Sequence, residues 1–212
     1  MRKVMLICSL HRENGLCNVG ELLKILRAVD PDVVFGEVSQ SDINFYDPRS
    51  LEHQAVTRLL TLKPSCERVP VDRYDIPPTF RAVTDAVFDF VEEASLEYQQ
   101  LLEQRHHATN LKGFAYLNGF AFTQVMTRMS EMEEKAIKQS ENQDLIRGLA
   151  TWRQVMHGRE RAMVENIYRY CKENKFDKGV FLVGAAHRSG VVKAIEESSN
   201  AGEDMIEWIL NF

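Results

Sequence analysis

Four polar side chains with the capacity for acid–base or metal chemistry stand at the ends of short apolar runs in this sequence: His11, Glu37, Asp72 and His187. The apolar runs cover residues 3–8, 33–36, 69–71 and 179–184. Runs of this length are typical of buried strands in a parallel sheet, and the carboxyl ends of such strands lie along one edge. Because open α/β sheets bind ligands outside that edge, the spacing predicts one site that contains all four side chains.

Two imidazoles and one carboxylate, from His11, His187 and Glu37, form a set that binds a divalent first-row metal such as Mn, Fe, Co or Zn. A water on that metal would ionise near neutral pH and attack a substrate. The same side chains could also activate water without a metal, because a histidine titrates near neutral pH and a carboxylate can orient its ring. The residues leave both schemes open. We expect Asp72 to orient a ligand or a histidine.

An arginine further along the chain could join this site. Arg159 lies beside Glu160 and Arg161 on a predicted helix, where such charges usually form a solvated face. An inward Arg159 could instead clamp a substrate carboxylate or hold Glu37 ionised through bidentate hydrogen bonds. Cys8, at the end of the first apolar run, is expected to be a buried and unreactive thiol.

Composition limits the class of protein. With 212 residues, 44% of them hydrophobic and 27% charged, the chain is long enough for one substantial core. A formal net charge of −5 argues against non-specific nucleic-acid binding, which needs Lys and Arg gathered on one face. No segment reaches about 18 consecutive apolar residues, the length of a membrane-spanning helix. We expect a cytoplasmic protein with neither nucleic acid nor membrane as a partner.

The elements that must position these residues follow an α/β pattern. Helices between the first three strands are predicted from Val19, with Asn18 as its N-cap, and over residues 51–62. From residue 79 to 174 the apolar residues recur at helical spacing, with members over 80–101, 114–129 and 145–170. A fourth strand, a short helix near Ser189 and a final strand within 205–210 follow. The prediction is a parallel or mixed central sheet flanked by helices, with a helical insertion between strands three and four.

We predict one α/β domain over residues 1–212, in which the insertion at 79–174 could cap the site. Four of its aromatic residues, Phe114, Tyr116, Phe120 and Phe122, favour a bundle core, although they could instead line an apolar pocket. An exposed apolar stripe on the insertion would indicate a docking surface, including one that forms a homo-oligomer.

Short motifs stand at the candidate positions. Gly184-Ala185-Ala186-His187 followed by Gly190 is a Gly-x-x-His motif, and Val34-Phe35-Gly36-Glu37 carries the glutamate; Val71-Asp72-Arg73 and Arg159-Glu160 with Met163 complete the set. In these motifs the chain resembles the superfamily that groups TraB-type proteins, Tiki proteases, erythromycin esterases and ChaN haem-uptake lipoproteins. The first histidine motif, Cys8-Ser9-Leu10-His11, has Cys where that superfamily usually has Gly.

The resemblance implies an α/β core with a helical insertion and a polar site of His11, Glu37, Arg159 and His187. Members of the superfamily divide between hydrolysis, which is metal-dependent in the Tiki proteases and water-activating in the erythromycin esterases, and haem binding in the ChaN-like proteins. We therefore expect a hydrolase-like protein that acts on a small-molecule or peptide substrate, with Arg159 stabilising an anionic group. The alternative is a non-catalytic module that binds haem or another small molecule in the same pocket.

Overall fold

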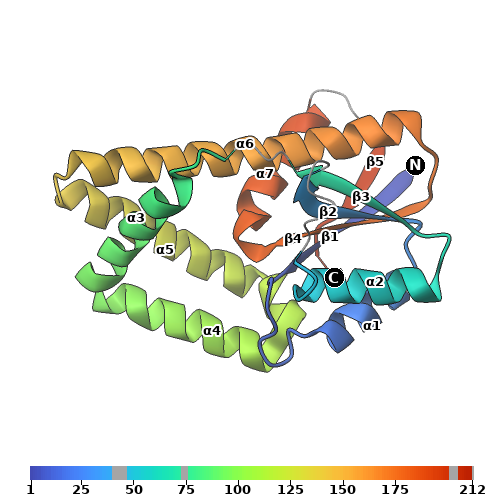
Figure 1. Ribbon diagram of the computed structural model, residues 1–212, viewed down its shortest axis with the longest axis horizontal. Helices are drawn as coiled ribbons and strands as arrows, with labels where there is room; N and C mark the ends of the chain where they lie inside the picture. The colour runs from blue at the N-terminus through green and yellow to red at the C-terminus, as the bar shows by residue number, and fades with distance from the viewer. Residues whose placement is uncertain (40–46, 73–75, 201–204, 212) are drawn as a thin grey trace.

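A five-stranded parallel sheet forms the centre of the computed structural model, which describes residues 1–39, 47–72, 76–200 and 205–211 (Figure 1). The strand order is β3-β2-β4-β1-β5. The strands are β1 (Arg2–Ser9), β2 (Val33–Ser39), β3 (Glu67–Asp72), β4 (Lys178–Gly184) and β5 (Ile206–Ile209). All pairings are parallel, so the carboxyl ends of the strands share one edge. The predicted α/β fold class is confirmed.

Helices cover both faces of the sheet. Figure 1 shows α1 (Val19–Val29) and α2 (Leu51–Leu62) on one face, with α7 (Arg188–Asn200) and the second half of α6 (Gln143–Glu173) on the other. The Asn18 side chain caps α1 by accepting a hydrogen bond from the N–H of Glu21, as its position predicts. A short 3₁₀ helix, η1 (Ala185–His187), joins β4 to α7.

Four helices stand between β3 and β4, where three were predicted. They are α3 (Phe80–Ala94), α4 (Leu96–Leu117), α5 (Phe120–Gln139) and α6. The predicted helix over 80–101 is divided at Ser95, whose backbone is extended and whose hydroxyl accepts a hydrogen bond from Tyr98 N. None of the helices in the described ranges has the length and apolar content needed to cross a membrane.

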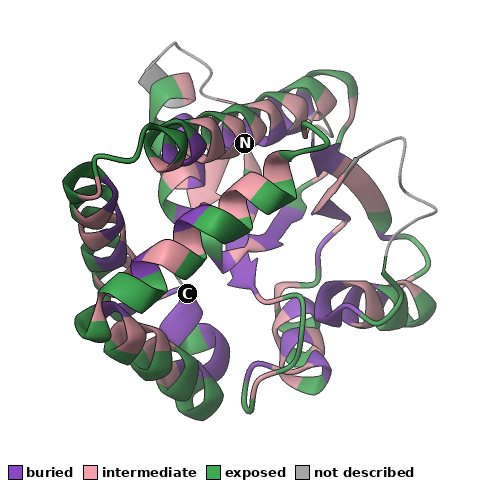
Figure 2. Ribbon diagram, turned by 60° about the vertical axis from the view of Figure 1, so that its left-hand side comes forward, coloured by how far each residue is buried: buried purple, intermediate pink, exposed green. Residues whose placement is uncertain are grey.

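The buried apolar residues form two clusters. One surrounds the sheet, and the other lies among α3, α4, α5 and the first half of α6. Helix α6 serves both, with Leu149 in the second cluster and Ile167 in the first. Figure 2 shows strands that are mostly buried at the centre, whereas the helices of the insertion expose much of their surface. The middle of α6 therefore lies where the two cores meet.

Asn118, at the end of α4, fastens the insertion to the end of β1. Strand β5 pairs with β1 only over Arg2–Met5, so the backbone of Cys8 lacks a strand partner on that side. The Asn118 amide supplies one: its Oδ1 accepts from Cys8 N at 2.8 Å and its Nδ2 donates to Cys8 O at 3.0 Å. This contact fixes the strand end that leads to His11.

Candidate functional site

The five predicted site residues lie together, at the carboxyl edge of the sheet and beside the middle of α6. Glu37 and Asp72 belong to the ends of β2 and β3, His11 and His187 follow β1 and β4, and Arg159 comes from α6. Parallel pairing brings these strand ends side by side, as in the register of Ser9 with Gly184. Arg73, the remaining residue of the third motif, lies outside the described residues.

Glu37 is the central carboxylate of the site. Its Oε2 accepts a hydrogen bond from Gly184 N at 2.7 Å, and its Oε1 lies 2.7 Å from Arg159 Nη2 and 3.1 Å from His187 Nε2. A Cβ on Gly184 would stand 3.1 Å from Glu37 Oε2 and 3.7 Å from His11 Nε2. The glycine of the Gly-x-x-His motif therefore lets Glu37 approach the backbone closely, whereas His11 would be in ordinary contact with a Cβ.

Arg159 joins two strand ends. Its Nη2 donates to Glu37, while Nε and Nη2 both donate to Asp72 Oδ2, at 3.1 and 2.6 Å. The Asp72 side chain is only 3% exposed. Of the two inward roles predicted for Arg159, its contact with Glu37 is the one that the structure contains. Asp72 is placed to orient Arg159, where we had expected it to orient a ligand or a histidine.

Glu160, which the sequence analysis did not select, binds the second nitrogen of His187. The distance from Glu160 Oε1 to His187 Nδ1 is 3.0 Å, and both side chains are 5% exposed. Gly190 makes this possible, because a Cβ there would stand 1.7 Å from Glu160 Oε2. Each glycine of the second motif thus lies where a Cβ would crowd a carboxylate of the site. The spacing of Glu160 from Met156, Met163 and Val164 places it on the inward face of α6, a signal that could have found it.

Glu52 is the second residue that sequence analysis did not select. It lies in the first turn of α2 and its Oε1 accepts from Ser9 Oγ at 2.6 Å and lies 3.2 Å from His11 Nδ1. The His11 backbone carbonyl accepts from Leu51 N, so the start of α2 fixes the loop as well. The His11 side chain is 69% exposed, whereas that of Glu52 is 6% exposed. A carboxylate on the face of α2 that carries Ala55 and Val56 was the available signal.

The pKa values of the site follow from these contacts. Burial alone would lower the pKa of His187, but hydrogen bonds to Glu160 and Glu37 outweigh it and raise that pKa to about 9. Burial would raise the pKa of Glu37, but His187 and Arg159 lower it to about 2. The hydrogen bond to Glu52 raises the pKa of His11 above its ordinary value. At neutral pH, His187 is therefore a cation and Glu37 a carboxylate.

In this arrangement His187 is not free to bind a metal together with His11 and Glu37. Both ring nitrogens of His187 are bound to carboxylates, and an imidazolium has no lone pair to give to a metal. Over the described ranges, no three His, Cys, Asp or Glu side chains are grouped so that they could hold a metal ion. Metal binding stays a prediction, and it would require His187 Nε2 to lose its proton and its bond to Glu37, while Nδ1 could keep its bond to Glu160.

Cys8 and three of the four aromatic residues considered above are buried. Cys8 is fully buried, and burial raises the pKa of its thiol to about 11, so it is not a nucleophile at neutral pH. Phe114, Tyr116 and Phe122 are buried, but in the cluster that surrounds the sheet and not in a bundle core, and Phe122 also lines a pocket. The Phe120 residue is 74% exposed.

Comparisons of the chain with protein-family models, with curated proteins and with solved structures find no match. The resemblance to the TraB, Tiki, erythromycin esterase and ChaN superfamily stays a prediction that rests on the motifs. The geometry described above is the basis for a proposal about function.

Proposed function

We propose that this site hydrolyses a small-molecule or peptide substrate, with His11 as the general base that activates water directly. The observation that carries the proposal is the pairing of His11 with Glu52. One ring nitrogen of an otherwise exposed imidazole is held by a buried carboxylate at 3.2 Å, which leaves Nε2 for proton transfer. Glu52 selects the tautomer with the proton on Nδ1, the form whose Nε2 accepts a proton.

Glu37 gives the attacking water a second contact. Its Oε2 accepts a hydrogen bond from Gly184 N, and a carboxylate oxygen can accept another. A water between His11 Nε2 and Glu37 Oε2 would donate one hydrogen bond to each. Removal of its proton by His11 would make a hydroxide beside the substrate. His187 and Arg159 keep Glu37 ionised, so it stays an acceptor throughout.

Arg159 is the group that would bind negative charge on the substrate. Its Nε and Nη2 are held by Asp72 and Glu37, whereas Nη1 donates a hydrogen bond to no described residue. The side chain is 17% exposed. A guanidinium that is oriented on one side and open on the other suits a substrate carboxylate or a developing oxyanion.

The test is hydrolysis of a panel of chromogenic esters, amides and peptides by the wild-type protein and by His11→Ala. His107→Ala is the matched control, because His107 is an exposed histidine on α4. We expect turnover that His11→Ala reduces by about 10²-fold or more and that the control retains. Turnover that is equal in His11→Ala would exclude His11 as the base.

Two further measurements distinguish the alternatives. Elemental analysis of protein purified without chelators, beside His187→Ala, would reveal a bound Mn, Fe, Co or Zn; direct activation predicts that activity survives chelation. If the panel shows no turnover, a Soret band on haem titration that His11→Ala removes would favour the haem-binding module. The cytoplasmic location and self-association through the insertion stay predictions.

A further inference from the structure

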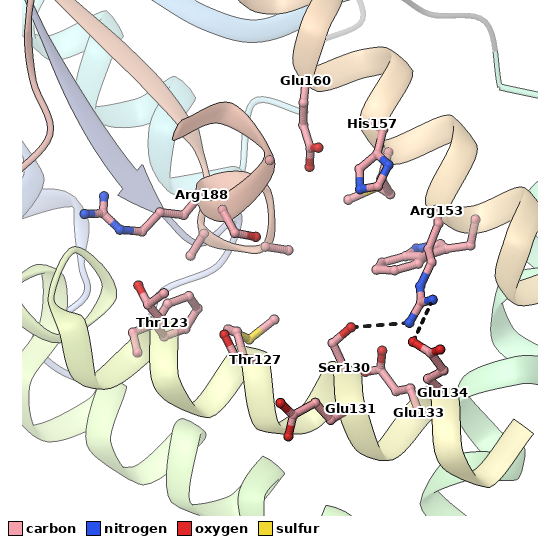
Figure 3. A pocket seen from close by; sticks show the side chains of 18 residues that line it. Thr123, Thr127, Ser130, Glu131, Glu133, Glu134, Arg153, His157, Glu160 and Arg188 are labelled. Atoms are coloured by element: carbon pink, nitrogen blue, oxygen red, sulfur yellow. Dashed lines mark hydrogen bonds and ion pairs between the residues drawn. The ribbon is translucent and has the colours of Figure 1, made fainter. Parts of the chain in front are cut away.

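A cavity of about 460 Å³ lies beside the ion network, between the insertion and the end of the sheet (Figure 3). Its walls come from α5, α6, η1 and the start of α7. Of the charged residues that surround His187, only Glu160 lines it. The cavity is therefore separate from the surface at His11, and it meets the network through one carboxylate.

Glu160 offers the cavity an unused acceptor. The residue is 4% exposed, and Figure 3 shows its side chain extending from α6 into the cavity. Oε1 is bound to His187, but Oε2 accepts a hydrogen bond from no residue in the described part of the chain. Because this oxygen belongs to a carboxylate on the cavity wall, it can accept a hydrogen bond from a ligand that carries a donor.

The two arginines on the cavity wall are both held by other groups. Arg153 donates to Ser130 and Glu134, as the dashed lines in Figure 3 show. The Arg188 side chain is directed away from the cavity and its Nη2 donates to the carbonyl of Leu210. Neither guanidinium is therefore placed to attract an anion into the cavity.

The carboxylate of Glu160 shares its charge partner with another carboxylate. His187 Nε2 lies 3.1 Å from Glu37 Oε1, and Glu37 is also bound to Arg159. Glu160 has His187 as its only ion-pair partner among the described residues, and His187 is shared with Glu37. A cation at Glu160 Oε2 would give this carboxylate a charge partner of its own.

Part of the remaining wall is apolar and polarisable. Phe122, Met126, Trp152 and Met156 line it. Aromatic faces attract organic cations through their quadrupole, and thioethers adapt to irregular apolar ligands. An acceptor at one end and aromatic and thioether groups along the wall fit an amine with a small apolar body.

We propose that this cavity binds a small organic ammonium ion, whose N–H donates to Glu160 Oε2 while its apolar body lies against Trp152 and the methionines. The proposal does not rest on water activation at His11, because it concerns binding in a separate cavity. A hydrolase and a non-catalytic protein could each contain such a site.

Tryptophan fluorescence can report on the cavity. The chain has two tryptophans, and Trp208 lies in β5 with its Nε1 bonded to Tyr168. In a Trp208→Phe background, Trp152 is the only tryptophan. The probes are benzylammonium, benzyl alcohol and benzoate, which share a ring and differ in charge. We expect a saturable change with benzylammonium at neutral pH, and binding of the other two that is weaker by about tenfold or more.

Three variants locate the binding. Glu160→Gln should weaken benzylammonium by about tenfold or more, and Glu165→Gln, an exposed position on the same helix, should not. Thr127→Phe should block the cavity, since Thr127 extends into it from α5. Circular dichroism checks that each variant folds. Equal binding of benzoate or benzyl alcohol, unchanged binding in folded Glu160→Gln or in Thr127→Phe, or no saturable change in the millimolar range would overturn the proposal.

Discussion

His11 and His187 follow neighbouring strands and each contacts a glutamate, yet the two histidine regions differ in burial and in the number of partners. His187 is 5% exposed and both of its nitrogens are bound to carboxylates; His11 is 69% exposed and one nitrogen is bound. An imidazole whose two nitrogens both contact carboxylates stays protonated and orients those carboxylates. An imidazole held at one nitrogen keeps a lone pair for proton transfer. The region of His187 positions the site, and the region of His11 is suited to react.

The largest effect is expected from removing the positioning histidine. His187→Ala would leave Glu37 and Glu160 buried with less positive charge between them, and breaking a buried ion pair costs about 3–5 kcal/mol. Urea unfolding of the wild type and the variant would measure the loss. A free energy of unfolding that falls by less than about 1 kcal/mol would show that His187 does not organise the carboxylates.

The reactive histidine should give the opposite result. His11→Ala removes an exposed imidazole from the buried Glu52, which keeps its hydrogen bond from Ser9, so we expect a loss near that of a surface pair, about 0–1 kcal/mol. The variant should therefore unfold close to the wild type while its hydrolysis falls by about 10²-fold or more. Loss of stability comparable to that of His187→Ala would remove the distinction between the two regions.

The pH dependence of stability should come from the positioning region, through His187 and Glu37. The folded pKa of His187, about 9, lies above its ordinary value of 6.5, so its stabilisation is full below pH 6.5 and is lost as pH rises through about 9. For Glu37, whose pKa falls from 4.5 to about 2, the stabilisation is present above pH 4.5 and is lost as pH falls through about 2. The wild-type Tm should fall from pH 6.5 to beyond 9, and His187→Gln should reduce that fall. Equal slopes in both proteins would contradict the assignment.

The smallest expected effect is a shift of the pH–rate profile, and it concerns the region of His11. A general base acts when neutral, so hydrolysis should rise as pH passes the pKa of His11, which Glu52 holds above 6.5. Glu52→Gln removes that hydrogen bond to a charge and should move the rising limb to lower pH. The pH–rate profiles of the two proteins measure this. A limb that stays in place, or moves to higher pH, would show that Glu52 does not act through His11.

The sequence was sufficient for the sheet and for the strand-end residues, because apolar runs and parallel strands follow local rules. The helix division at Ser95 was not foreseen, since a hydroxyl that caps a helix looks like any exposed serine until the chain turns there. Glu52 and Glu160 were missed for a different reason. Their partners are 41 and 27 residues away from them, so only the tertiary fold shows that these carboxylates face histidines.

The number of residues in helix α6 sets how the insertion is oriented relative to the site. Arg159 and Glu160 are adjacent, so their side chains leave the helix about 100° apart, toward different strand ends. Only one rotation of α6 satisfies both. One residue inserted in α6 before Arg159 would turn the insertion by about 100° about the helix axis relative to the sheet, whereas seven inserted residues would nearly restore its direction. Relatives with longer or shorter insertions should therefore differ by lengths close to whole numbers of turns in this helix.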